Sequence, residues 1–291
     1  MKALVVRLDG VTGVLLAGPA VRAVATRADP VTVLCAPGGE PAARLLPHVD
    51  DVLVRHPPWE TPGSGAVDED ALVRRLRADA YDVALVVAPG GSSPEPAERL
   101  LREARVDRLG ACGDPGAEAA LDPAATLGFS PRARDDGRLR VLPPPDTARL
   151  TGNGPCVVVH PGAGPPGRAW DPDRCAAAVT APADAGHRVV VTGGPEETAQ
   201  TGDAGGNTAV DPSGRTDPRR PAGVPRAADA VVTGAPGPAH LAAATGAPVV
   251  PLVPPGGPRR PHGEPSVLLD PDAGTAQDVA RAVHRLLDGR T

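Results

Sequence analysis

The sequence predicts an α/β protein made of two domains, each a doubly wound parallel sheet. Short β-branched apolar runs recur along the chain between turn residues, and stretches with a helical pattern separate them. Continuous apolar strands are typical of parallel sheets that helices cover on both faces, and the alternation predicts repeated βαβ units. The length of 291 residues also allows two domains of roughly 100 to 200 residues each.

The apolar runs and the helical stretches alternate in the following order. The predicted strands are residues 3–6, 31–34, 52–54, 83–87, 157–159, 189–191, 230–232 and 249–253. The predicted helices are residues 14–25, 41–46, 69–77, 95–103, 172–185, 238–245 and 275–287. Pro182 is expected to kink or stop its helix, because proline lacks the backbone N–H. Three prolines and a glycine predict a loop at 217–226.

The regular recurrence of apolar runs stops between residues 121 and 151, where proline, glycine and charged residues dominate. This composition is typical of an interdomain linker, here with one edge strand. We therefore predict an N-terminal domain over 1–150 and a C-terminal domain over 151–291. Two Rossmann-like domains facing a cleft are the GT-B architecture, whose ligand lies at the carboxyl ends of the strands.

Composition and charge narrow the classes of function. The net charge of −5 and the scattered basic residues exclude a nucleic-acid partner. Arg7 and Asp9 interrupt the N-terminal apolar run, so we expect a cytoplasmic protein with no integral membrane segment. The four cysteines form no CxxC pair, which argues against a zinc site or a disulfide framework.

Aromatic residues are scarce: two Trp, one Tyr and one Phe stand against 38 Pro and 35 Gly. The core must therefore consist of Val, Leu and Ala. Aromatic side chains normally bury about 150 to 250 Å² each. Because this chain has few of them, we expect a low free energy of unfolding.

Residues 231–253 are the most informative segment, because they read as a buried strand, a glycine-proline turn, a helix start and a second strand. Gly237 and Pro238 open this helix, and free amides with a partial positive charge at a helix N-terminus suit a diphosphate. His240 follows in the first turns. It either donates a hydrogen bond to the diphosphate or sugar, or is a buried histidine satisfied by backbone.

Four segments together resemble a known family. HPGAG at 160–164, GGPEE at 193–197, GRT at 214–216 and the segment 231–253 resemble the C-terminal half of glycosyltransferase family nine, the ADP-heptose transferases. RLDGVTGVLLAGPAVRAV at 7–24 resembles the opening strand, loop and helix of that family. The resemblance implies inverting, metal-independent transfer of a heptose-like sugar from a nucleotide-diphosphate donor on the C-terminal domain. A hydroxyl acceptor, a saccharide or a small metabolite, would bind the N-terminal domain.

The resemblance also implies the donor-binding residues. His160 and Gly162 begin a turn whose glycines let backbone approach a ligand. Arg168 would neutralise the leaving diphosphate, or is a solvated loop charge. Gly194 ends a strand, and Glu197 would bind the ribose hydroxyls or favour a helix start. The predicted donor site comprises His160, Gly162, Arg168, Gly194, Glu197, Gly237, Pro238 and His240, with no cofactor besides the donor sugar nucleotide.

The sequence departs from the family at two carboxylates. The family has its proposed base, an aspartate, where this chain has Gly13, and an aspartate where it has Ala235. A general base contributes about 10² to 10⁴-fold to rate. Asp9 is the nearby carboxylate that would replace the base, and its alternative role is an N-cap or turn residue.

Metal and other cofactor chemistry find little support. Asp-x-Asp triplets at 68–70, 171–173 and 270–272 lie at helix starts and turns, where capping explains them, so we predict no metal. The chain lacks the P-loop and hydrolase-elbow fingerprints.

Two other functions remain open. A non-catalytic GT-B scaffold that binds a nucleotide or a protein would explain Gly13, Ala235, the proline-rich helices and the few aromatics. A GT-B epimerase would need carboxylates near the anomeric carbon, and the first loop has no obvious pair.

Overall fold

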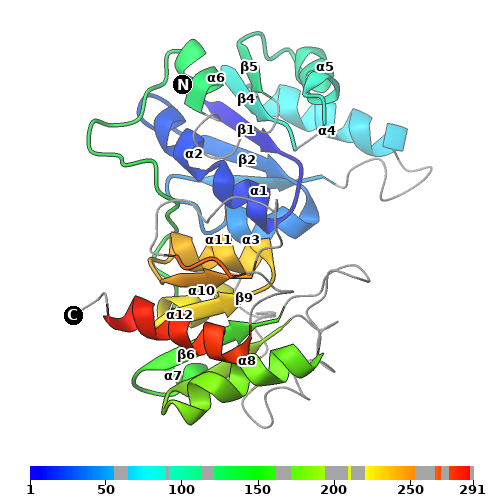
Figure 1. Ribbon diagram of the computed structural model, residues 1–291. Helices are drawn as coiled ribbons and strands as arrows, with labels where there is room; N and C mark the ends of the chain where they lie inside the picture. Colours follow the sequence, from blue (N-terminus) through cyan, green and yellow to red (C-terminus); the bar gives the residue numbers. More distant parts are fainter. Residues whose placement is uncertain are drawn as a thin grey trace. The chain divides into compact units, whose positions relative to one another are not determined.

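The computed structural model divides into two compact units, Met1–Leu142 and Pro143–Thr291, where the sequence placed the boundary near 150. Each unit holds one parallel sheet, with five strands in the described residues (Figure 1). The structure describes residues 1–55, 65–89, 92–112, 121–161, 172–193, 209–210, 220–252, 266–269 and 275–288.

The first unit has the strand order β3-β2-β1-β4-β5. The chain reverses its direction of winding between β1 and β4, the place where doubly wound sheets bind ligands at the carboxyl edge. The strands are β1 Ala3–Arg7, β2 Val31–Cys35, β3 Asp51–Val54, β4 Val83–Val87 and β5 Leu109–Cys112. The helices are α1 Val11–Leu16, α2 Gly18–Val24, η1 Pro37–Gly39, α3 Glu40–Ala43, α4 Gly65–Asp79, α5 Glu95–Glu103 and α6 Leu121–Thr126.

Strand alternation builds the core of this unit. Leu4 and Val6 of β1 lie on the face that packs against Leu76 of α4 and against Leu100 and Leu101 of α5. α1 and α2 cover the opposite face (Figure 1). The predicted helix 14–25 is divided into these two helices, and Pro19 lies in the first turn of α2, where its missing N–H costs nothing.

The segment after α6 belongs to the first unit and contains no strand, so the predicted edge strand in the linker was wrong. A fork of hydrogen bonds ties this segment to α2. Arg22 donates from Nε and Nη2 to the two carboxylate oxygens of Asp135, both at 2.7 Å, and from Nη2 to the carbonyl of Arg138 at 2.9 Å. Both side chains are largely buried. The ion pair therefore replaces sheet pairing as the anchor of the segment.

The second unit has the strand order β10-β9-β6-β7-β8. One face packs against α8 and α12, through Val157, Val159 and Val283, and the other packs against α10 and α11. The strands are β6 Cys156–His160, β7 Arg188–Thr192, β8 Ala209–Val210, β9 Ala230–Thr233 and β10 Val249–Pro251. The helices are α7 Ala148–Thr151, α8 Pro172–Asp184, α10 Arg220–Arg226, α11 Pro236–Ala244 and α12 Ala276–Asp288.

Two segments that contain proline, 220–226 and 172–184, both form helices. The loop predicted for 217–226 was wrong, because Arg220–Arg226 forms helix α10. Pro221 is its second residue, where the N–H has no helical partner, and Pro225 lies near its end. Pro182 lies inside α8, which ends two residues later at Asp184. Pro182 therefore did not stop α8, whose end is followed by Gly186 in the left-handed region (φ 89°), and the prolines of 220–226 did not prevent α10.

No helix within the described ranges is long and apolar enough to cross a membrane. The described aromatic side chains, Tyr81 and Phe129, are both buried in the first unit.

Candidate functional site

The carboxyl end of β1 carries a fixed carboxylate. Arg7, buried at the end of the strand, donates from Nε to Oδ1 of Asp9 at 2.9 Å and from Nη2 to Oδ2 at 2.7 Å. Its Nη1 donates to the carbonyl of Ala88, just after β4, at 3.1 Å. A bidentate guanidinium fixes both the position and the plane of a carboxylate. The Asp9 side chain keeps a quarter of its surface exposed, so it remains accessible to a ligand.

Gly13 leaves the space that this carboxylate occupies. A Cβ added to Gly13 would overlap the carboxylate carbon and both oxygens of Asp9. A Cβ on Gly39 would lie 2.5 Å from the carbonyl oxygen of Asp9, so this glycine also makes room for the loop. The N-cap of α1 is Gly10, and no side chain caps it, which removes the N-cap role considered for Asp9. The carboxylate of Asp9 therefore lies where a side chain at position 13 would begin.

Cys35 ends β2 close to this loop. Burial raises the pKa of its thiol to about 12, and the charges of Glu40 and Asp9 add to the effect. A thiol with such a pKa stays protonated at neutral pH and is a poor nucleophile.

In the second unit, three neighbouring strands end in polar residues. The ring Nδ1 of His160, at the end of β6, lies 3.0 Å from Oγ1 of Thr192, at the end of β7. His160 is also in register with Thr233, at the end of β9. Both threonines are buried. The hydroxyl of Thr192 holds the imidazole at the carboxyl edge of the sheet.

The turn from β9 to α11 packs directly against this edge. Gly234 donates its N–H to the carbonyl of His160 at 3.2 Å, and a Cβ on Gly234 would lie 2.6 Å from the carbonyl oxygen of Pro161. The hydroxyl of Thr233 accepts a hydrogen bond from the N–H of Ala235 at 3.0 Å. A glycine is required here because two backbone segments meet. The packing brings His160 close to the start of α11.

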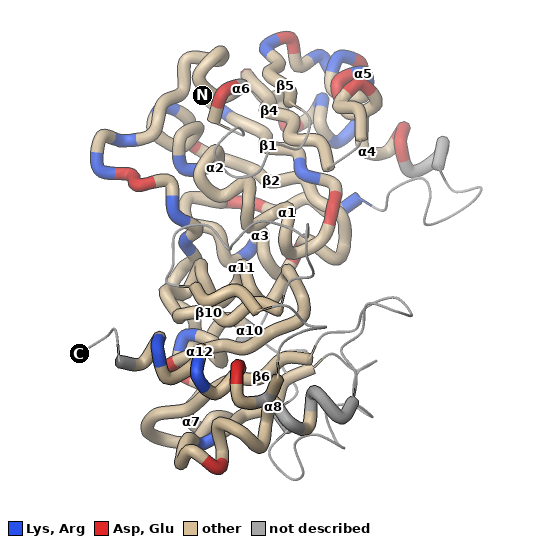
Figure 2. The backbone as a smooth tube through the Cα atoms, viewed as in Figure 1, with Lys and Arg blue, Asp and Glu red and all other residues tan. Residues whose placement is uncertain are grey.

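The start of α11 offers fewer amides than the sequence suggested. Pro236 and Pro238 have no N–H, and the N–H of Ala235 is bonded to Thr233. Gly237 is therefore the first-turn residue with an amide to give. No Lys, Arg, Asp or Glu lies between residues 230 and 252 (Figure 2). Any anion here would interact with the helix dipole and the Gly237 amide.

His240 lies one turn further along α11 and is 9% exposed. The remaining predicted donor residues, Gly162, Arg168, Gly194 and Glu197, lie outside the described residues. No cluster of three metal-binding side chains occurs in the part of the chain that the structure describes.

Sequence reasoning missed three residues at these strand ends: Arg7, Thr192 and Thr233. Each had a signal. Arg7 and Asp9 are two residues apart, so strand alternation places them on one face. The two threonines are hydroxyl residues that close the apolar runs of β7 and β9.

Comparisons with known proteins bear on the family and on the fold. Residues 130–261 match the model of glycosyltransferase family 9 (heptosyltransferase). A search of curated proteins finds no match. The chain is similar in structure to a glycosyl transferase of family 9 from Veillonella parvula, with a TM-score of 0.82, 14% identity, and 99% of this chain and 97% of that chain covered.

Two structures from E. coli are also similar. ADP-heptose lps heptosyltransferase II has a TM-score of 0.73 at 18% identity, covering 100% of this chain and 99% of its own. Heptosyltransferase WaaC with ADP has a TM-score of 0.69 at 18% identity, covering 99% and 98%. These likenesses confirm the α/β GT-B fold class, and with the family model they confirm the resemblance. They support a glycosyltransferase and do not support the non-catalytic scaffold.

Proposed function

We propose that this chain, a glycosyltransferase family 9-like protein, transfers a heptose-like sugar from a nucleotide-diphosphate donor to a hydroxyl acceptor, with inversion and without a metal. One observation carries the proposal. The Asp9 carboxylate, held by Arg7, lies over Gly13, where the family has its proposed base. In this proposal the base comes from position 9 instead of position 13, and its carboxylate still lies beside the start of α1.

Asp9 would act as general base. An ionised carboxylate has about four lone-pair sites, and Arg7 uses one on each oxygen. One of the remaining lone pairs would accept the proton of the acceptor hydroxyl. The acceptor oxygen would then bond to the anomeric carbon from the face opposite the leaving group, while the bond to the diphosphate breaks. One displacement of this kind inverts the anomeric configuration.

The second unit would hold the donor. His160, oriented by Thr192, and the Gly237 amide at the start of α11 lie at the carboxyl edge, where a diphosphate would bind. The developing charge on the diphosphate would be stabilised by these fixed dipoles, as in other sites that are preorganised for a leaving anion. The similar E. coli heptosyltransferase WaaC was solved with ADP, so we propose ADP as the nucleotide.

Calorimetric titration with ADP, UDP and GDP tests the donor site. We expect saturable binding of ADP, weakened in His160→Ala. Absence of binding at millimolar nucleotide would overturn the proposal.

Turnover of ADP-heptose tests the base. Asp9→Asn should bind ADP as the wild type does but lose turnover by about 10² to 10⁴-fold, because it cannot accept the proton. The exposed Asp70 of α4 provides the matched control, since Asp70→Asn removes a carboxylate that has no proposed role. Full activity in Asp9→Asn would refute the assignment of the base.

A further inference from the structure

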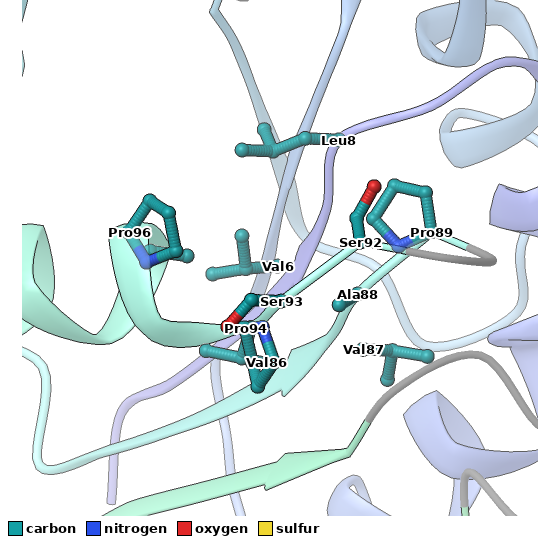
Figure 3. Close-up of a pocket in the computed structure, with 11 residues that line it drawn as sticks. Val6, Leu8, Val86, Val87, Ala88, Pro89, Ser92, Ser93, Pro94 and Pro96 are labelled. Carbon is teal, nitrogen blue, oxygen red and sulfur yellow. The ribbon is translucent and has the colours of Figure 1, made fainter.

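A pocket of about 290 Å³ opens at the carboxyl ends of β1 and β4 in the first unit (Figure 3). It lies at the point where the strand order reverses, the usual ligand position of a doubly wound sheet. Ligand pockets commonly span about 300 to 1,000 Å³, so this one suits a single ring or a short branched chain. Its walls are Val6, Leu8, Val86, Val87, Ala88, Pro89, Ser92, Ser93, Pro94, Pro96 and Ala97.

The lining carries no charge. Its side chains are aliphatic or proline, apart from two serines, and the hydroxyl of Ser93 already accepts a hydrogen bond from the N–H of Glu95 at 3.2 Å. Glu95 and Glu98 lie in the first turn of α5, beside the pocket wall at Pro96 and Ala97. A carboxylate or phosphate entering the pocket would lose its hydration and find no cationic side chain in the lining. An uncharged, apolar group fits the lining.

The pocket borders the loop that carries the proposed base. Leu8 lines the pocket and immediately precedes Asp9. Ala88, another lining residue, accepts the hydrogen bond from Nη1 of Arg7. Val6 and Leu8 line the pocket, whereas the side chain of Arg7, which lies between them in the sequence, is outside the lining and is hydrogen-bonded to Asp9. The pocket and the carboxylate therefore flank the same strand end.

We propose that this pocket binds an uncharged, apolar part of the acceptor whose hydroxyl Asp9 deprotonates. This inference rests on the proposed function and adds the chemical class of the acceptor. A group anchored beside Leu8 leaves its hydroxyl free to cross the end of β1 toward Asp9. The acceptor would thus be an alcohol with a neutral apolar portion rather than an anionic saccharide.

Fluorine NMR on the protein alone tests the pocket, with 4-(trifluoromethyl)benzyl alcohol as the neutral probe. We expect saturable binding that benzyl alcohol displaces and that 4-(hydroxymethyl)benzoate displaces at least about 10-fold less well, because its charge must be desolvated. Equal displacement by the benzoate, or no probe binding at millimolar concentration, would overturn the proposal.

Variants locate the probe. Ala97→Leu fills the pocket from α5 and should weaken probe binding at least about 10-fold, as should Ser92→Leu at its exposed rim, which leaves the core untouched. Ala71→Leu, at an exposed position of α4, is the matched control. Unchanged binding in both pocket variants would refute the site. Probe binding without nucleotide binding would reject the transferase, whereas nucleotide binding without probe binding would reject the pocket.

Discussion

The β1–α1 loop of the first unit and the β9–α11 turn of the second both connect a buried strand to a helix, but they place different polar groups at the strand end. Each follows a buried strand, each depends on a glycine against neighbouring atoms, and each has a residue without a carboxylate, Gly13 or Ala235, where the resemblance implies an aspartate. In the first unit another carboxylate, that of Asp9, fills the space. In the second, the hydroxyl of Thr233 accepts a hydrogen bond from the N–H of Ala235.

This difference fits the two roles proposed for the loops, proton transfer in the first unit and anion binding in the second. The first loop keeps a charged side chain with a fixed orientation, as proton transfer requires. The second has no charged residue from 230 to 252 and relies on backbone dipoles, which suffice to hold an anion. Under the proposed function, the loop that would move a proton has a fixed carboxylate, and the turn that would bind an anion has none.

The largest expected effect comes from moving the carboxylate. Asp9→Ala should reduce turnover about 10² to 10⁴-fold, and adding Gly13→Asp should restore most of it, because the space over α1 is then vacant for the new side chain. Steady-state kcat of the two variants measures the recovery. Failure of the double variant to exceed Asp9→Ala would show that the place of the carboxylate at the start of α1 is not what matters.

The Arg22–Asp135 pair should give the next largest effect. Asp135→Asn leaves the buried guanidinium without its charged partner, and breaking such a pair costs about 3 kcal/mol or more. Urea unfolding followed by hydrogen–deuterium exchange should show earlier opening of peptides from the first unit. Arg44, an exposed residue paired with Glu40, supplies a control, because Arg44→Gln should change stability little. Equal loss in both units would contradict the prediction.

Acid should weaken the first unit through the same pair. The hydrogen bonds from Arg22 lower the pKa of the Asp135 carboxyl from 3.8 to about 2. A carboxyl with a lower pKa in the folded chain binds fewer protons there, so its contribution is present above pH 3.8 and lost as pH falls toward 2. Thermal melts between these pH values should show this loss in the wild type and not in Asp135→Asn.

The smallest effect concerns the turn of the second unit. Thr233→Val removes the hydroxyl that accepts the Ala235 N–H, a loss of about 1 kcal/mol, comparable to that of a helix cap. Affinity for ADP, measured by calorimetry, should fall several-fold, and Thr233→Ser should retain it. Equal weakening by valine and serine would assign the effect to packing instead.

The strands were predictable because apolar runs such as those of β1, β4 and β6 are long enough to show their pattern. β8 has two residues, Ala209 and Val210, and is too short to show any. The helix α10 was missed because composition counts prolines without their positions, and Pro221 occupies a place where proline is harmless.

For the site, the sequence indicated Asp9 but could not show where its carboxylate lies. The overlap with a side chain at position 13 depends on the bidentate hold of Arg7 and on the close approach of Gly39. Such contacts arise from tertiary packing. The threonines at the ends of β7 and β9 could not be assigned to the site from the sequence, because it is the sheet that places them beside His160.

The overlap between Asp9 and position 13 also couples the two positions. A change to aspartate at position 13 would either crowd two carboxylates beside one guanidinium, displacing Asp9 from Arg7, or, if Asp9 were replaced first, pass through a form with neither. Both intermediates are handicapped in the chemistry proposed for this loop. Positions 9 and 13 are therefore expected to depend on each other, so that the effect of a substitution at one is set by the residue at the other.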